Sequence, residues 1–454
     1  MKRIKYLCVL AIVFATCLAS CSKGKPLTAE EISYFERNVA IDSLLQRQLL
    51  NCDLLSVAYD CTAVASLDTS CAIFLRNRGI TNQKNSGRCW YFSTTNILRR
   101  EMIMEYDLDS FQFSQTYGQF WDLMEKSNRF LDNVISARRQ PLRSRFNCWL
   151  FSKPFGDGGH FLNAAHLIHK YGVIPQEVMP EVHSSMDNAR LMRTLRTLMR
   201  KRGLELRSCH RRNIDSIRVS ALEDVYRLLR LTLGDPPKEF TWTLRDRNGC
   251  VIDTKNYTPL SFRDRFVRHD MEKDYAILMN DPTLPYHKMY SVHKSGNCYE
   301  YLDWTFLNLP MDEINRIALA SLKGGDMFYI SADTYQDTLQ RRGLYSTETF
   351  RTDSLLGINL HMSKQELLES DEISSAHAMA VAGVDTLSDG RPSKWIIENS
   401  FGTTRGFGGY VIMTSPWFDR YVLRAAVLRK YLPANIEKET HRRPHRIPAW
   451  NPTY

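Results

Sequence analysis

The eight most informative residues of the chain are Gln83-Lys84-Asn85-Ser86-Gly87-Arg88-Cys89-Trp90. Two later segments supply an imidazole and an amide: Ala376-His377-Ala378 and Glu398-Asn399-Ser400-Phe401-Gly402. A cysteine attacks as its thiolate, an imidazole takes the proton and later protonates the leaving amine, and an amide orients the imidazole ring. The segments therefore predict a cysteine peptidase with Cys89 as nucleophile and His377 as general base and acid. Asn399 is expected to orient the ring, and Gln83 to donate a hydrogen bond to the oxyanion.

The residues around Cys89 and Asn399 decide between a catalytic and a structural role for each. A lone cysteine is more often a small buried hydrophobe than a nucleophile, and a lone Asn399 could simply cap a strand. The signature around a papain-type nucleophile is Cys-Gly-Ser/Ala-Cys-Trp/Tyr. The segment Ser86-Gly87-Arg88-Cys89-Trp90 keeps the Gly, Cys and Trp, and it has Ser for the first Cys and Arg for the small residue. The match to papain itself is therefore real but atypical.

The sequence separations of Cys89, His377 and Asn399 distinguish this chain from typical papain-like peptidases. Typical papain-like chains place His and Asn about 130 to 150 residues after the cysteine. Here His377 follows Cys89 by 288 positions and Asn399 follows His377 by 22. The sequence resembles the bleomycin hydrolase and aminopeptidase C family, papain-like peptidases that carry Gln-x-x-x-Gly-Arg-Cys-Trp and a long insertion between the two parts of the site.

The resemblance extends from about residue 30 to the C-terminus. Further similar blocks are Phe113-Ser114-Gln115, Phe120-Trp121-Asp122, 125–131, Asp157-Gly158-Gly159, 170–175, 178–181, 259–262, His377-Ala378-Met379, Gly383-Val384-Asp385 and Trp450-Asn451-Pro452. They imply an α+β papain-like fold in two parts, a helical half and an antiparallel β-barrel half, with a large, mainly helical insertion.

The expected organisation has six parts. They are a signal peptide at 1–20, an N-terminal arm at 21–70, the helical half with Cys89 at 71–184, the insertion at 185–310, the barrel half with His377 and Asn399 at 311–433, and a C-terminal tail toward the cleft at 434–454. A chain this long exceeds the size of a single core, and its 43% hydrophobic and 11% aromatic residues exclude disorder of the whole.

Local patterns place the chemistry on the fold. The run 90–102 lacks Gly and Pro and predicts a buried helix that Cys89 opens. A helix N-terminus beside an imidazolium stabilises a thiolate, so we expect a lowered thiol pKa. Strands are predicted at 327–331, 377–384, 395–398 and 410–413, between Gly, Asp and Ser clusters. Phe401 is expected to shield the hydrogen bond between Asn399 and His377 from water.

The N-terminus is typical of an exported lipoprotein. Lys2, Arg3 and Lys5 precede an apolar run too short to span a bilayer. Leu18-Ala19-Ser20-Cys21 then resembles a bacterial lipobox, whose cysteine accepts a lipid and becomes the mature N-terminus. We expect a protein of the bacterial cell envelope, lipid-anchored through Cys21 and facing the periplasm or the exterior. An ordinary cleaved signal is the alternative.

Basic residues are concentrated in one segment. Removing the signal takes three cations from the formal net charge of +10. In 190–202 the apolar residues Leu191, Leu195, Leu198 and Met199 recur at helical spacing, which predicts an amphipathic helix whose Arg and Lys side chains form the polar face. A solvated face is the default interpretation, and nucleic-acid binding is an alternative that is not expected.

The resemblance also implies partners. Family members place a C-terminal carboxylate in the cleft, where it pairs with the free amine of the peptide substrate. Here the chain stops at Trp450-Asn451-Pro452-Thr453-Tyr454, a few residues sooner. Tyr454 is therefore the candidate for the substrate amine, and a relaxed endo- or oligopeptidase specificity is the alternative. The family further implies a homo-oligomer, a hexamer that encloses its active sites.

Other classes of function are less favoured. No cofactor is expected. His-Glu-x-x-His is absent and His166 and His169 lack companions, which disfavours a metallopeptidase. A lipoprotein that captures peptides without cutting them stays an alternative. After the assigned cysteines, seven others remain, and their disulfide pairing cannot be inferred.

Overall fold

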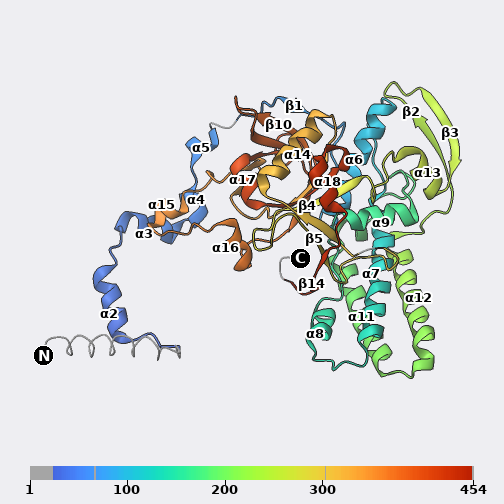
Figure 1. The fold of residues 1–454 in the computed structure, drawn as a ribbon, viewed down its shortest axis with the longest axis horizontal. Helices are drawn as coiled ribbons and strands as arrows, with labels where there is room; N and C mark the ends of the chain where they lie inside the picture. The colour runs from blue at the N-terminus through green and yellow to red at the C-terminus, as the bar shows by residue number, and fades with distance from the viewer. Residues whose placement is uncertain (1–23, 66–67, 302, 452–454) are drawn as a thin grey trace. The chain divides into compact units, whose positions relative to one another are not determined.

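The computed structural model describes residues 24–65, 68–301 and 303–451 (Figure 1). The chain divides into two compact units, Met1–Tyr59 and Asp60–Tyr454. The expected signal peptide, the lipid acceptor Cys21 and the terminal Tyr454 lie outside the described residues. Within the described part, no helix has both the length and the apolar character that a membrane span needs.

The described part of the first unit, residues 24–59, contains three short helices: α2 (Ala29–Asn38), α3 (Ser43–Asn51) and α4 (Leu54–Ala58). Each follows a capping residue, Thr28, Asp42 or Asp53, whose side chain accepts a backbone N–H of the first turn. Such caps satisfy N–H groups that the helix itself leaves unpaired. The expected arm at 21–70 extends beyond this unit, and its bounds stay a prediction.

The second unit is built around α6 (Cys89–Glu105), the helix predicted after Cys89. Every residue from 90 to 99 is buried. Beside α6 lie α7 (Gln115–Ala137) and α9 (Phe161–Tyr171). The absence of Gly and Pro from α6 allows an unbroken helix with side chains buried on all sides, as the sequence indicated.

A 12-stranded sheet runs through the described part of this unit in the order β14-β5-β6-β4-β13-β7-β10-β11-β12-β9-β8, with β1 also paired to β10. Its strands are β1 (Ile73–Phe74), β4 (Tyr275–Met279), β5 (Lys288–Val292), β6 (Thr305–Asn308), β7 (Phe328–Ala332), β8 (Thr338–Leu339), β9 (Leu344–Tyr345), β10 (His377–Thr386), β11 (Pro392–Glu398), β12 (Tyr410–Thr414), β13 (Val422–Leu428) and β14 (His445–Ile447). Most neighbours are antiparallel, and the four strands predicted from sequence correspond to β7, β10, β11 and β12.

Strand β10 lies between two apolar layers. Ala378, Ala380 and Ala382 belong to the cluster that includes α6, whereas Met379 and Val381 belong to a second cluster with α14 (Met311–Lys323) and α17 (Ser415–Tyr421). Successive side chains of a strand point to opposite faces. Three small alanines on one face allow α6 to approach the sheet closely, and the Ala378 N–H at the start of β10 contacts the Cys89 thiol at the start of α6.

Long helices and a hairpin occupy much of the region between the two parts of the candidate site. Helices α11 (Ala189–Ser208) and α12 (Ile214–Leu233) pack with α7, side by side in Figure 1. The predicted amphipathic helix is confirmed as α11, with Leu191, Leu195 and Met199 buried. The hairpin consists of β2 (Phe240–Arg245) and β3 (Val251–Tyr257).

The expected boundary at residue 310 does not coincide with an edge of the main sheet, because β4, β5 and β6 belong to that sheet. The six-part division therefore stays a prediction. The remaining elements are short: α5 (Cys61–Ala65), α8 (Arg145–Ser152), α10 (His183–Met186), η1 (Arg211–Asn213), α13 (Pro259–Phe266), α15 (Thr352–Leu356), α16 (Lys364–Glu369), η2 (Arg429–Tyr431) and α18 (Ala434–Thr440).

Candidate active site

His377 and Asn399 come together through one strand pair. His377 opens β10 and Asn399 directly follows β11, and these strands are antiparallel, with Ala380 opposite Glu398. The start of β10 therefore lies beside the end of β11. The His377 Nε2 atom is 2.9 Å from Asn399 Oδ1, and both residues are buried.

The hydrogen bonds of Asn399 determine the tautomer of the imidazole. Asn399 Oδ1 also accepts the Ser400 backbone N–H at 2.8 Å, so the contacting atom is the acceptor of the amide. His377 Nε2 must then carry the proton, which leaves the Nδ1 lone pair to accept one. The Phe401 ring stacks on His377 with the ring centres 4.9 Å apart and the planes at 11°. This is the position expected for a side chain that keeps water from the hydrogen bond between Asn399 and His377.

Hydrogen bonds to Ser86 and to Ser400, the residue after Asn399, fix the position of Gln83. Its Nε2 donates to the Ser86 carbonyl at 2.6 Å, and its Oε1 accepts the Ser400 hydroxyl at 2.6 Å. The Gln83 backbone N–H also donates to the Ser400 carbonyl at 2.8 Å. An amide nitrogen carries two N–H groups, so one remains for a ligand in the cleft.

Gln83, Cys89 and His377 line one cleft of about 730 Å³. Its walls come from both halves of the fold: Gln83, Ser86, Gly87 and Cys89 lie on one side, and Ser331, Thr334, Ser375, Ala376, His377 and Ala378 lie on the other. Asn399 does not line the cleft, and it contacts the His377 ring at Nε2. The predicted catalytic residues are therefore brought together, although 288 positions separate Cys89 from His377.

The arginine that precedes Cys89 has a structural partner. Arg88 is 2% exposed, and its guanidinium donates to both carboxylate oxygens of Glu181, at 2.9 and 2.7 Å. Glu181 also accepts hydrogen bonds from Thr116 and Ser185. A bidentate pair of this kind fixes geometry as well as charge. Sequence reasoning noted both residues in motifs but assigned no role to the pair.

Gly87 allows another close contact at the rim of the cleft. Its N–H donates to Asp157 Oδ2 at 2.6 Å, and a Cβ at this position would lie 2.5 Å from Asp157 Oδ1. Burial acts to raise the pKa of Asp157, but hydrogen bonds from Asn188 and Gly87 outweigh burial and lower it. Asp157 therefore stays ionised and holds the turn before Cys89.

The thiol differs from the sequence expectation in its resting ionisation. Burial raises the pKa of the Cys89 thiol to about 11, and the backbone N–H groups of Ala378 and Trp90 offset burial only in part. Burial likewise lowers the pKa of His377, opposed by its hydrogen bond to Asn399. The expected lowering of the thiol pKa is thus wrong for the resting pair, because loss of hydration outweighs the helix N-terminus.

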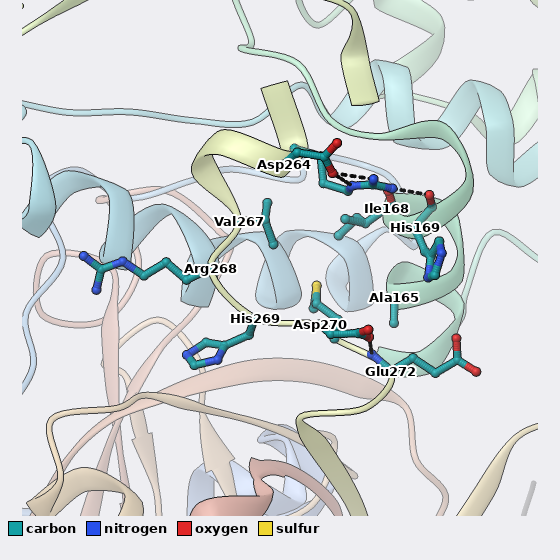
Figure 2. Close-up of a pocket in the computed structure, with 11 residues that line it drawn as sticks. Ala165, Ile168, His169, Asp264, Val267, Arg268, His269, Asp270 and Glu272 are labelled. Atoms are coloured by element: carbon teal, nitrogen blue, oxygen red, sulfur yellow. Dashed lines mark hydrogen bonds and ion pairs between the residues drawn. The ribbon is translucent and has the colours of Figure 1, made fainter. Parts of the chain in front are cut away.

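A second hollow lies away from these residues. It has a volume of about 350 Å³ and lies between α9 and the segment that ends α13 and follows it (Figure 2). Several of its polar groups already have partners: Arg263 donates to Asp264 and to the His169 carbonyl, and Asp270 accepts the N–H groups of Glu272 and Lys273. None of the candidate catalytic residues lines this hollow.

The two histidines considered as metal ligands have another environment. His166 stacks on Tyr301 with ring centres 4.5 Å apart, and the ring centre of His169 is 5.7 Å from that of Tyr301. Among the described residues no group of three or more His, Cys, Asp or Glu side chains is placed to hold a metal ion. The cysteines of the described part, eight in number, are all free thiols.

Comparison with known proteins agrees with this architecture. The sequence matches the Peptidase C1-like family over residues 26–453. It is 36% identical over 396 residues to aminopeptidase C of Lactobacillus delbrueckii subsp. lactis, covering 85% of this chain and 88% of that protein. It is 31% identical over 396 residues to bleomycin hydrolase of Gallus gallus, covering 84% and 87%.

A solved structure shares the whole fold. The crystal structure of PepW from Lactobacillus rhamnosis HN001 superposes with a TM-score of 0.90 at 31% identity, covering 94% of this chain and 98% of that one. The fold and the relatives define a papain-like cysteine peptidase of the aminopeptidase type. The chain belongs to the Peptidase C1-like family.

Proposed function

We propose that this protein is a papain-like cysteine aminopeptidase that releases N-terminal residues from peptides outside the cytoplasm. The observation that carries the proposal is the 2.9 Å contact between His377 Nε2 and Asn399 Oδ1, with Cys89 and Gln83 lining the same cleft as His377. This is the set of groups that thiol-dependent acyl transfer needs. The names of the relatives support peptides as the substrates.

The chemistry follows from the tautomer of His377. Nδ1 accepts the thiol proton while Cys89 Sγ forms a bond to the scissile carbonyl carbon. Gln83 Nε2–H stabilises the oxyanion, and the imidazolium then protonates the leaving amine as the C–N bond breaks. Water, deprotonated by His377, hydrolyses the thioester and regenerates the thiol. Asn399 keeps Nε2 protonated and the ring oriented throughout.

The test is hydrolysis of aminoacyl fluorogenic amides and of N-blocked peptides under reducing conditions. Cleavage of substrates with a free α-amine, lost in Cys89→Ala, supports the proposal. Cleavage of blocked peptides as well points to the relaxed specificity discussed below. If neither is cut, a lipoprotein that only binds peptides becomes the better hypothesis.

Gln83→Ala is expected to lower kcat by about 10²- to 10³-fold with little change in KM, because the amide N–H binds charge that develops only in the transition state. Steady-state kinetics on one aminoacyl amide measure the effect. Gln365→Ala on α16, an exposed residue bound to Glu369, is the matched control and should keep the wild-type kcat. A large rise in KM with kcat unchanged would contradict this role.

As pH falls, kcat/KM is expected to decrease with a midpoint below pH 6.5. The folded pKa of His377 is lowered from its usual 6.5 by burial, so the neutral imidazole that accepts the thiol proton persists to lower pH. Protonation of the imidazole, not loss of the fold, removes activity as pH falls. Rates at saturating and limiting substrate across the acid range, with the fold followed by circular dichroism, measure this. An acid limb centred above pH 6.5 contradicts the assignment.

A relaxed endo- or oligopeptidase specificity is the second candidate, and one feature favours it. The cleft shares Lys153, Gly156, Gly158 and Gly159 with an adjoining hollow of about 540 Å³, which Ala449 also lines. This adjoining space gives room beside the cleft for more than one residue of a peptide substrate. The products released from a series of peptides of increasing length test this alternative. If every peptide yields single-residue products only, the relaxed specificity is wrong.

The proposed location of the protein is based on its N-terminal sequence. We infer that Cys21 carries a lipid and anchors the protein in the bacterial cell envelope, facing the periplasm or the exterior. Membrane fractionation and the intact mass of wild-type and Cys21→Ala protein test this. The wild-type protein should sediment with membranes and carry a lipid mass that Cys21→Ala lacks.

Two further expectations follow from the resemblance. A homo-hexamer enclosing the sites would restrict substrates to unfolded peptides, and sedimentation of the detergent-solubilised protein tests that state. Nucleic-acid binding through α11 is not expected, because Arg200 donates to the Phe151 and Ser152 carbonyls and Arg202 pairs with Glu205 and Asp224. Binding that falls steeply with salt would overturn that expectation.

A further inference from the structure

One arginine of α11 lines the candidate active-site cleft. Arg196 shares this cleft with Cys89 and His377, on the helix whose Leu195 and Met199 are buried in the core. Packing of these neighbours fixes the rotation of α11 and with it the side from which Arg196 projects. The guanidinium of Arg196 therefore places a positive charge at the cleft, from a helix that lies between Cys89 and His377 in the sequence.

Arg196 lacks the partners that other arginines of α11 have. Its Nε atom is buried without a hydrogen-bond partner, and no carboxylate of the described residues lies within ion-pair distance of its guanidinium. By contrast, Arg200 donates to two carbonyls, at 2.9 and 2.6 Å, and Arg207 donates to the Ala137 and Gln140 carbonyls. A partly buried guanidinium without an acceptor is costly unless a ligand supplies one.

The cleft as a whole has an excess of positive charge. Its ionised side chains are Lys84, Lys153 and Arg196 against the single carboxylate of Asp157. That carboxylate already accepts hydrogen bonds from the Gly87 N–H and the Asn188 amide, at 2.6 and 2.9 Å. Three cations against one carboxylate leave the cleft with an excess of positive charge, which attracts an anionic group of the substrate.

The position of Arg196 indicates which side of the scissile bond it faces. Arg200, one helical turn further on, binds the carbonyls of the two residues before Lys153, so Arg196 lies along the wall formed by 153–159. His377, which protonates the leaving amine in the proposed mechanism, comes from β10 in the other part of the site. The wall that carries Arg196 is therefore the one that faces the acyl part of the substrate.

We propose that Arg196 is a specificity-determining residue that binds a carboxylate on the substrate residue whose carbonyl is attacked. This proposal rests on the proposed peptidase function. A guanidinium presents paired N–H groups that match the two oxygens of a carboxylate, which a neutral amide cannot replace. Substrates with Glu or Asp at this position are then preferred over those with Gln or Asn.

The test compares matched aminoacyl amides. For the wild-type protein, kcat/KM for the Glu amide should exceed that for the Gln amide by about tenfold or more, since a hydrogen bond to a charged group has that strength. In Arg196→Gln the ratio should fall to about one, with Arg196→Lys intermediate because it keeps the charge without the planar fork. Added salt should reduce the wild-type ratio.

Arg193→Gln is the matched control, since Arg193 is exposed one turn earlier on α11 and does not line the cleft. It should keep the wild-type ratio, and melting curves show whether each variant folds. A ratio near one in the wild-type protein, or an equal ratio in Arg196→Gln, overturns the proposal while Gln-amide cleavage still supports the peptidase.

If no amide is cut, the peptidase function fails separately. Dissociation constants of Glu- and Gln-containing dipeptides, measured on Cys89→Ala with and without Arg196→Gln, then decide. Tighter binding of the Glu peptide that depends on Arg196 supports the proposal, and equal binding overturns it.

Discussion

Replacing Cys89 with alanine is expected to lower kcat by at least about 10⁴-fold, because the variant has no nucleophile and keeps only the oxyanion donor and the binding cleft. The melting temperature should not change. Cys89 opens α6 with its side chain at the cleft, and alanine is a good helix former. Initial rates on one aminoacyl amide and a thermal melt measure both quantities.

Cys148→Ala is the matched control for this variant. Cys148 is a free, exposed thiol on α8 and does not line the cleft. It should keep the wild-type rate and the wild-type sensitivity to thiol-alkylating reagents. Retention of more than a small fraction of activity in Cys89→Ala would assign the nucleophile elsewhere.

Breaking the ion pair between Arg99 and Glu398 is expected to have the largest effect on stability. Arg99 lies on α6 and Glu398 ends β11, and the N–O distance is 2.6 Å with the side chains 3% and 0% exposed. Arg99→Met leaves a buried carboxylate whose one remaining hydrogen-bond donor among the described residues is the Asn77 amide. The free energy of unfolding should fall by about 3–5 kcal/mol. Denaturant unfolding measures it.

A double-mutant cycle isolates the pair. Arg99→Met with Glu398→Leu removes both charges and should recover much of the stability that either single change loses. Arg391→Ala, which breaks an exposed pair with Asp389, should leave the unfolding midpoint unchanged. Single and double variants of equal stability would mean that the two charges do not interact.

Loss of this pair should also affect catalysis. Glu398 is followed directly by Asn399, and Arg99 is on the helix that Cys89 opens. The pair therefore connects the strand that orients His377 to the helix that presents the thiol. Partial activity in a folded single variant, restored toward wild type in the double variant, is the expected pattern.

Local patterns predicted the elements that carry the chemistry. The run without Gly or Pro after Cys89 forms α6, and the apolar runs at 377–384 and 395–398 form β10 and β11. These predictions succeeded because helix and strand periodicity depend on neighbouring residues. The α+β fold class and the family were confirmed as well.

Contacts between distant segments could not be predicted in this way. The partners Arg88 and Glu181 are 93 positions apart, and Arg99 and Glu398 are 299 apart. Nothing in one sequence pairs particular charges across such distances. Pairing between strands far apart in the sequence is equally hidden: β4 pairs with β13, β6 with β4, and β5 with β6. The expected end of the insertion at residue 310 stays a prediction.

The resting ionisation of the thiol was missed for a different reason. The helix N-terminus is visible in the sequence, whereas the loss of hydration at Cys89 depends on how closely α6 packs on β10. Burial then outweighs the helix terminus, and the pKa rises to about 11. A sequence motif locates a nucleophile but does not fix its charge.

The order of the segments along the chain has a consequence for biosynthesis. The thiol is made early, at residue 89, whereas the proposed base His377 opens β10 and the proposed orienting residue Asn399 directly follows the paired strand β11. Chains are made from the N-terminus, and α6 acquires its imidazole only after β10 and β11 have folded against it. A nascent chain therefore carries a thiol that has no proton acceptor beside it, and we expect it to be latent until synthesis is nearly complete. Hydrolytic activity and completion of the sheet are thus coupled events in the life of each molecule.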